Sequence, residues 1–217
     1  MLRKYIKTRL GYSWKRMRKW LKPKQDSIDY ARLFEELKAL ILQEDEGKIK
    51  IFFADESGFS LVPSVPYGWS KKNKTICILS QRSKRLNVFG LYSRNNDFKC
   101  YQTEGSITAE QVVTYIDDFS KTIKTPTVMI MDNATVHKSK IIQEKIKEWE
   151  ELGLTIWYLP AYSPHLNLIE TLWRKIKHEW LKPHDFADKE TFRNAIENIL
   201  KNVGKVYKVS FKKETFI

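Results

Sequence analysis

Residues 127–133 read TVMIMDN, a short and mostly apolar run that ends in an acid and an amide. Such a run is typical of a strand buried on both faces. Residues 51–55, IFFAD, repeat the pattern. Ligands in open α/β sheets gather beyond the carboxyl ends of strands, so neighbouring strands of this kind would bring Asp55 and Asp132 to one crevice.

The two aspartates have two possible explanations. Carboxylates in one crevice repel each other unless a cation lies between them, and Mg²⁺ held by carboxylates and substrate phosphates suits such a place. Alternatively each aspartate only opens a turn, because Asp and Asn are common just after strands. The turn is the simpler explanation for Asp55 or Asp132 alone, and a shared site is the simpler one for the pair.

Hydrophobic periodicity predicts helices and strands along the rest of the chain. The expected helices are 27–45, 108–122, 138–151, 165–181 and 188–202. The expected strands are 49–54, 75–79, 86–92, 98–102, 127–131 and 154–159. Consecutive strands followed by alternating helices and strands indicate the α/β class, a mixed sheet flanked by helices.

Glu170 is the third candidate acid. The apolar stripe of the helix 165–181 leaves Glu170 at the edge of the buried face, where an unpaired carboxylate is costly and a metal would account for it. The alternative is a capping box that begins at Asn167. Ser163-Pro164 offers an earlier start to the helix, which would place Glu170 inside it and weaken the capping explanation.

The charge of the chain favours a polyanionic partner. Its 217 residues contain 39 Lys and Arg against 26 Asp and Glu, a formal net charge of +13. Nucleic acid is the first candidate and an anionic membrane surface the second. Residues 1–25 contain no acid and form either a basic arm on DNA phosphates or a basic helix packed on the domain.

Aromatic residues among bases give a second signal for DNA. Trp69, Lys71 and Lys72 combine a stacking ring with cations, as proteins that hold unpaired nucleotides do. The alternative is a hairpin whose Trp69 packs on the core. Arg174 and Lys177, on the same helix as Glu170, are further candidates for DNA contact.

Two cysteines, Cys77 and Cys100, exclude a disulfide framework and fit a reducing compartment. No apolar run approaches the roughly 18 residues of a membrane span, and the basic N-terminus lacks the apolar segment of a signal peptide. A soluble intracellular protein without a membrane partner is therefore expected.

Three stretches resemble the motifs of mariner/Tc-like bacterial insertion-sequence transposases, members of the DDE endonuclease superfamily. They are FADESG at 53–58, MDNATVH at 131–137 and LPAYSPHLNLIETLW at 159–173. The resemblance covers roughly residues 50 to 180, and its third motif is the longest and most specific. The interval between Asp132 and Glu170 is slightly longer than is usual in the family.

The resemblance implies an RNase H-like fold and an Asp-Asp-Glu triad. Matched position by position, the triad is Asp55, Asp132 and Glu170, which would bind two Mg²⁺ or Mn²⁺ ions and act catalytically. Asn133, His137 and Asn167 match positions beside the triad, where they would support it. For His137 the alternative is a satisfied polar residue at a helix start. Glu56 should point to the other face of its strand, away from the triad.

The family also implies cleavage of DNA at transposon ends and strand transfer into target DNA, in the bacterial cytoplasm at the nucleoid. Family members usually begin with helix-turn-helix domains, so residues 1–25 are interpreted as an arm or linker remnant and 26–217 as the catalytic domain. A homodimer and a separately encoded helix-turn-helix half are possible partners. The alternatives are a nuclease of the same fold without strand transfer, and a non-catalytic DNA-binding remnant.

Overall fold

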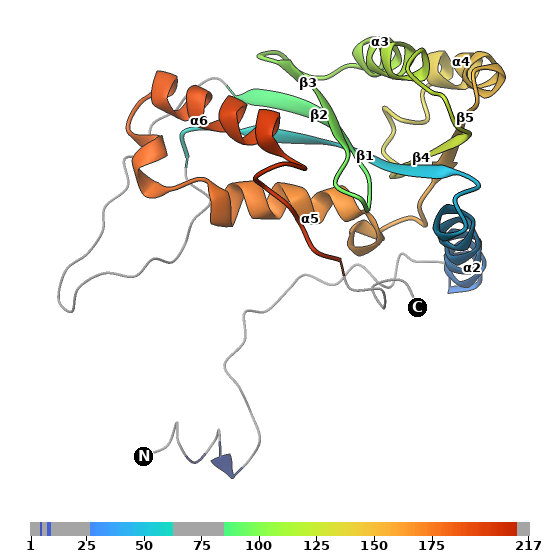
Figure 1. Ribbon diagram of the computed structural model, residues 1–217, viewed down its shortest axis with the longest axis horizontal. Helices are drawn as coiled ribbons and strands as arrows, with labels where there is room; N and C mark the ends of the chain where they lie inside the picture. The colour runs from blue at the N-terminus through green and yellow to red at the C-terminus, as the bar shows by residue number, and fades with distance from the viewer. Residues whose placement is uncertain (1–4, 6–7, 10–26, 63–84, 212–217) are drawn as a thin grey trace.

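The chain folds around a five-stranded mixed sheet (Figure 1). The computed structural model describes residues 5, 8, 9, 27–62 and 85–211. In spatial order the strands are β3 (Phe98–Thr103), β2 (Leu86–Tyr92), β1 (Lys50–Phe59), β4 (Thr127–Met131) and β5 (Leu154–Tyr158). The first three are antiparallel, whereas β1, β4 and β5 are parallel. The mixed sheet flanked by helices, predicted from the sequence, is confirmed.

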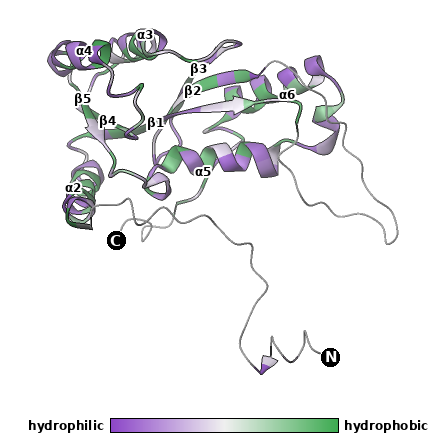
Figure 2. Ribbon diagram, turned by 180° about the vertical axis from the view of Figure 1, so that it is seen from behind, coloured by the Kyte–Doolittle hydropathy of each residue, from purple (hydrophilic) through white to green (hydrophobic). Residues whose placement is uncertain are grey.

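Helices cover both faces of this sheet (Figure 1). They are α2 (Ser27–Asp45), α3 (Ala109–Ser120), α4 (Lys140–Glu151), α5 (Leu168–Lys175) and α6 (Lys189–Asn202). One core packs α3 and α4 against the face that carries Phe52 and Met129. The other packs α2, α5 and α6 against the face that carries Phe53 and Ile130. Figure 2 shows hydrophobic and hydrophilic residues alternating around α5 and α6, as expected of helices with one buried face.

The start of α3 shows how the sequence sets a helix boundary. Thr108 accepts a hydrogen bond from the backbone N–H of Gln111, and the Gln111 side chain accepts one from the backbone N–H of Thr108. This reciprocal capping box satisfies two backbone donors that the first turn would otherwise leave unpaired.

Two predicted elements differ from the observed ones. The strand predicted to end at Ala54 runs on to Phe59, because β2 pairs with β1 from Phe53 to its end. The single helix predicted over 165–181 is three pieces, the 3₁₀ turn η2 (Pro164–Leu166), α5, and the π-helical turn η3 (Ile176–Trp180). The predicted strand 75–79 and most of the predicted basic arm lie outside the described residues.

In the part of the chain that the structure describes, no helix is both long enough and apolar enough to cross a membrane.

Candidate active site

The candidate site lies where β1 and β4 part. Their parallel pairing covers residues 50–53 of β1 and 127–130 of β4, and Asp132 follows the last residue of β4. Asp55 lies two residues beyond the pairing, inside β1 rather than after it. The sequence-based placement of Asp55 at the end of a strand is therefore wrong in detail. Asp55 nevertheless lies at an open edge, because β1 is no longer paired with β4 at this residue.

Asp55 is surrounded by other acids. Burial and the charges of Glu170, Glu56 and Asp132 raise the pKa of Asp55 to about 8. An acid in such surroundings favours its neutral form unless a cation compensates it. The three predicted triad acids are therefore electrostatically coupled, although they come from β1, the segment after β4 and α5.

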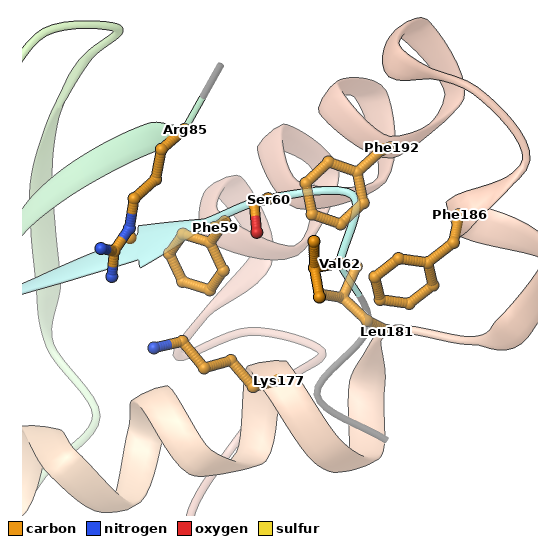
Figure 3. A pocket seen from close by; sticks show the side chains of 9 residues that line it. Phe59, Ser60, Val62, Arg85, Lys177, Leu181, Phe186 and Phe192 are labelled. Carbon is orange, nitrogen blue, oxygen red and sulfur yellow. The ribbon is translucent and has the colours of Figure 1, made fainter. Parts of the chain in front are cut away.

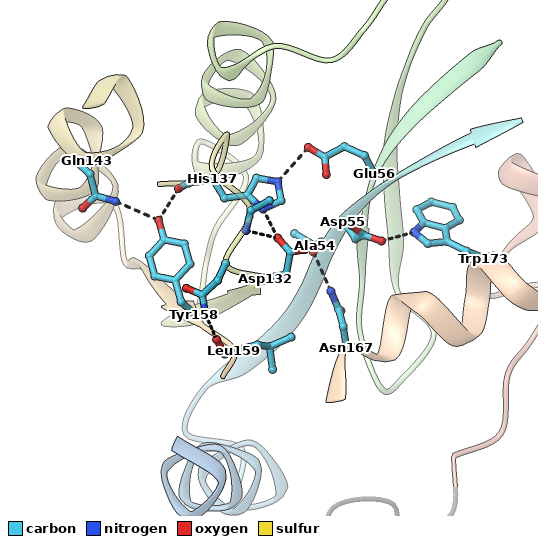
Figure 4. A network of polar contacts seen from close by, with 12 residues as sticks. Ala54, Asp55, Glu56, Asp132, His137, Gln143, Tyr158, Leu159, Asn167 and Trp173 are labelled. Atoms are coloured by element: carbon cyan, nitrogen blue, oxygen red, sulfur yellow. Dashed lines mark hydrogen bonds and ion pairs between the residues drawn. The ribbon is translucent and has the colours of Figure 1, made fainter. Parts of the chain in front are cut away.

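The indole of Trp173 in α5 holds one oxygen of Asp55. Its Nε1 donates to Asp55 Oδ2 at 3.2 Å (Figure 4). Gly90 of β2, which pairs with Asp55 in the strand register, makes room for this ring. A Cβ at Gly90 would lie 2.7 Å from two atoms of the Trp173 ring. Gly90 and Trp173 thus together fix the orientation of Asp55.

Asp132 belongs to a chain of hydrogen bonds that returns to β1. The fully buried ring of His137 donates from Nδ1 to Asp132 Oδ1 at 2.7 Å and from Nε2 to Glu56 Oε1 at 3.0 Å (Figure 4). The backbone N–H of Ala134 donates to the same Asp132 oxygen at 2.9 Å. The hydrogen bond from His137 lowers the pKa of Asp132, against the effect of burial.

His137 is held as an imidazolium. Burial lowers its pKa, but the hydrogen bonds and charges of Asp132 and Glu56 outweigh burial and raise it to about 10. The Glu56 side chain was expected to stand apart from the three acids. It makes no direct hydrogen bond to them, yet it is joined to Asp132 through His137, a link that the sequence analysis did not foresee.

Glu170 lies in the first turn of α5 and is exposed. Its side chain is thus more exposed than the predicted position at the edge of the buried face implied. Partial desolvation still raises the pKa of Glu170; Lys177 opposes this and Asp132 adds to it. The capping box is also absent, since Asn167 makes no side-chain cap.

Asn167 and Asn133 brace the backbone around the acids. The buried Asn167 amide donates to the carbonyl of Ala54 at 3.3 Å, and the Asn133 amide donates to the carbonyl of Leu159. The Oδ1 atoms of both side chains are buried and have no hydrogen-bond partner among the described residues. Asn133 follows Asp132 directly and Asn167 holds the carbonyl before Asp55, so both amides fix the backbone that carries these two acids.

The candidate DNA-contact residues divide into two groups. Trp69, Lys71 and Lys72 lie outside the described residues. Arg174 is exposed on α5, whereas Lys177 is half-buried and interacts electrostatically with Glu170.

The acids fit divalent cations in chemistry, but not as one closed cage. Among the described residues, no three His, Cys, Asp or Glu side chains are grouped closely enough to hold one ion. Mg²⁺ needs no such cage, because it commonly binds through one or two carboxylates, waters and substrate phosphates. Asp55, coupled to both other acids, could share one ion with Asp132 and another with Glu170.

The sequence of the chain matches a known protein family. The model described as DDE superfamily endonuclease matches residues 50–193, and the chain belongs to this family. It is 23% identical over 167 residues to a Shigella sonnei protein described as "Insertion element IS630 uncharacterized 39 kDa protein". That match covers 75% of this chain and 48% of the relative, so the chain spans about half the length of this curated protein.

Solved structures show the fold. The crystal structure of the mariner Mos1 paired end complex with Mg is similar with a TM-score of 0.60 at 10% identity, over 98% of this chain and 66% of that one. The corresponding complex with Mn is similar with a TM-score of 0.57 at 11% identity, over 99% and 65%. The fold is therefore RNase H-like, as the sequence motifs implied.

Two site residues escaped the sequence analysis. Trp173 was assigned only to an apolar stripe, although it stands inside the third motif. Glu56 was set aside because strand alternation points it away from Asp55. Neither residue carries a local signal for its role, because each partner comes from a distant part of the chain.

Proposed function

We propose that the chain is the catalytic domain of a DNA transposase of an insertion element, which cuts DNA at the ends of the element and joins it to target DNA. The observation that carries the proposal is the coupling of Asp55, Asp132 and Glu170 where β1 and β4 part. Asp55 lies in β1, Asp132 follows β4 and Glu170 lies in α5, so three separate parts of the chain contribute one acid each. The family of the chain and the insertion-element relative point to the same activity.

The proposal assigns the three carboxylates to two Mg²⁺ or Mn²⁺ ions. When bound, such a pair activates water or a DNA 3′-hydroxyl and stabilises the oxygen that leaves. The protein orients the acids: Trp173 holds Asp55, His137 and the Ala134 N–H hold Asp132, and Asn167 fixes the carbonyl before Asp55. His137, Asn133 and Asn167 thus act by positioning.

DNA is the proposed partner because of the +13 charge, because Arg174 lies on α5 with Glu170, and because Lys177 lies on η3, which follows α5 directly. Trp69, Lys71 and Lys72 are proposed as further DNA contacts. A bacterial cytoplasmic location at the nucleoid, a homodimer and a separately encoded helix-turn-helix partner accompany the proposal. The alternatives are a nuclease without strand transfer and a non-catalytic DNA-binding remnant.

The test replaces Asp132 by Asn and Glu170 by Gln, one at a time. Each change keeps the shape and removes one negative charge, so cleavage of supercoiled DNA in Mg²⁺ should fall by at least about a thousandfold while the melting temperature is kept. Glu151→Gln, at an exposed acid at the end of α4, is the matched control and should cleave normally.

A Glu170→Gln protein that nicks DNA at the wild-type rate would remove Glu170 from the site. A second assay, with a pre-cut DNA end and a target plasmid, distinguishes a transposase from a nuclease that does not join DNA. Joined products support the transposase, whereas hydrolysis without joining supports the nuclease. Absence of nicking by the wild-type protein in both metals favours the remnant.

A further inference from the structure

A cavity of about 330 Å³ lies beside the candidate active site (Figure 3). The end of β1, η3 and the segment up to α6 line it. Its apolar wall consists of the almost completely buried Phe59, Phe186 and Phe192 and the exposed Val62. Its polar side carries Arg85 and Lys177. Cavities of this size that combine apolar walls with a few fixed charges are typical of small-ligand sites.

The two cations of this cavity form no salt bridge in the part of the chain that the structure describes, although the charges of Glu170 and Asp55 act on Lys177. Among the described residues, no carboxylate lies within salt-bridge distance of Arg85 or Lys177. Burial and the charge of Arg85 lower the pKa of Lys177, while Glu170 and Asp55 act in the opposite sense. Two like charges held near each other are stabilised when an anion joins them, and an oxyanion such as phosphate suits an arginine and a lysine together.

The position of Arg85 depends on a glycine. The Arg85 side chain lies across Gly58 of β1, and a Cβ at Gly58 would come within 1.5 Å of its Nε. Gly58 therefore lets the guanidinium lie flat over the strand at the cavity. Lys177 lies on the opposite wall with its Nζ 5.4 Å from the centre of the Phe59 ring (Figure 3).

Lys177 also connects the cavity to the acids. The charges of Glu170 and Asp55 raise the pKa of Lys177, so this side chain lies near enough to both acids to interact with them electrostatically.

We propose that this cavity holds one unpaired nucleotide of the DNA substrate, with its phosphate between Arg85 and Lys177 and its base against the apolar wall, of which Val62 is the exposed part. This inference rests on the proposed function, because it takes DNA as the substrate. Proteins that hold unpaired nucleotides combine basic groups for the phosphate with an apolar or aromatic surface for the base.

The experiment uses the full chain in EDTA, so that no step depends on cleavage. Two DNA probes are compared, a blunt duplex and the same duplex with a short single-stranded extension that contains 5-iodouracil. Wild-type protein should bind the extended duplex more tightly, and irradiation should attach the iodouracil to a residue of the cavity, found by mass spectrometry. Arg85→Ala should lower affinity for the extended duplex about tenfold and for the blunt one less than about twofold.

Two further variants sharpen the comparison. Gly58→Ala keeps every charge but displaces Arg85, and should behave like Arg85→Ala. Arg174→Ala removes the same charge from the exposed face of α5, and should change affinity for both probes by the same factor. Arg85 is exposed, so its replacement should leave the melting temperature unchanged.

Three results would overturn the inference. Arg85→Ala could weaken both probes equally, which would make Arg85 part of a general basic surface. The crosslink could map outside the cavity. Phe192→Ala could lower stability without changing the crosslink, which would mean that protein fills the cavity. Wild-type protein that gives the expected crosslink but never cuts DNA in Mg²⁺ would contradict the proposed function instead, and leave the binding site standing.

Discussion

Gly90 lies opposite Asp55 in the strand register, and the space above it is filled by the Trp173 ring that donates to Asp55. Gly90→Ala should therefore have two effects. Overpacking against a buried ring should lower the free energy of unfolding by about 1–3 kcal/mol. Displacement of the indole should also lower DNA cleavage in Mg²⁺ by roughly ten- to a hundredfold, because a misplaced catalytic group is costly.

Two variants separate packing from orientation at this position. Trp173→Phe removes the N–H but keeps an aromatic ring, so it should lower cleavage more than stability. Gly105→Ala is the control, since the nearest atom to its added Cβ is 3.8 Å away in an exposed segment. Urea unfolding and plasmid nicking measure the two effects. Normal nicking by Trp173→Phe would show that Asp55 needs no help from the indole.

The charge of Asp55 should destabilise the metal-free protein. Its folded-state pKa of about 8 is above the reference value of 3.8, so between these values the folded state keeps a proton that the unfolded chain has released. Stability linked to this group is therefore present at low pH and lost as the pH rises through this window. Asp55→Asn in EDTA should gain on the order of 5 kcal/mol near pH 8 and almost nothing near pH 4.

Thermal unfolding at the two pH values measures this gain, which corresponds to roughly 2–4 °C per kcal/mol in a chain of this size. Glu151→Gln, at an exposed acid, should change neither melting temperature. Mg²⁺ should raise the melting temperature of the wild-type protein and have less effect on Asp55→Asn. Equal melting temperatures of the wild-type protein and Asp55→Asn in EDTA at pH 8 would mean that the charge of Asp55 does not destabilise the metal-free protein.

Among the elements, β1 has two different partners, and this decides where the site lies. Its first half pairs with β4 and its second half continues beside β2 alone. Consecutive apolar residues made the first half predictable. Local sequence could not reveal the second half, because Asp55, Glu56 and Ser57 become strand only through pairing with β2, about thirty residues away along the chain.

The start of the helix that carries Glu170 also depends on a contact with a distant part of the chain. Its apolar stripe was recognised correctly, but its start was placed too early, at Ser163-Pro164. The structure starts α5 after Asn167, whose side chain donates to the Ala54 carbonyl in β1 instead of capping the helix. The hydrogen bond from Asn167 to Ala54 thus takes the place of the side-chain cap that the local sequence suggested. The three acids themselves were found because each stands in a motif, whereas Glu56 and Trp173 act through contacts that no motif spacing encodes.

The Glu56–His137–Asp132 link ties β1 to the segment after β4. Glu56→Ala would leave a fully buried imidazolium with one of its two carboxylate partners. The free energy of unfolding should fall by about 1–3 kcal/mol, because a hydrogen bond to a charged group is lost. Mg²⁺-dependent cleavage should fall as well, since His137 would no longer be held from both sides.

Glu56→Gln is the matched variant, because it keeps an acceptor for the ring N–H. It should recover much of the stability, and cleavage should recover with it if orientation is what matters. Glu144→Ala, at an exposed acid on α4 that forms an ion pair with Lys140 at 3.6 Å, should leave both properties unchanged. If Glu56→Ala cleaved DNA at the wild-type rate, the Glu56–His137–Asp132 link would contribute to stability and not to cleavage.

For the whole molecule, the net charge of +13 predicts that affinity for DNA comes mainly from electrostatic attraction to phosphates. Each phosphate neutralised by a lysine or arginine releases counter-ions, so the logarithm of affinity should fall linearly with the logarithm of salt concentration. With on the order of six phosphate contacts, affinity should drop about a thousandfold between roughly 50 and 200 mM salt. Fluorescence anisotropy with a labelled duplex at several salt concentrations gives the slope.

Removal of residues 1–25 separates the basic arm from the rest of this charge. The segment contains ten Lys and Arg and no acid. If it lies on DNA phosphates, its loss should make the salt slope shallower and weaken binding to duplexes of any sequence by a similar factor, because phosphate contacts carry no base information. A slope unchanged by the deletion would mean that the arm packs on the domain. A flat dependence for the intact chain would mean that its cations do not form the DNA-binding surface, and the argument from charge would fail.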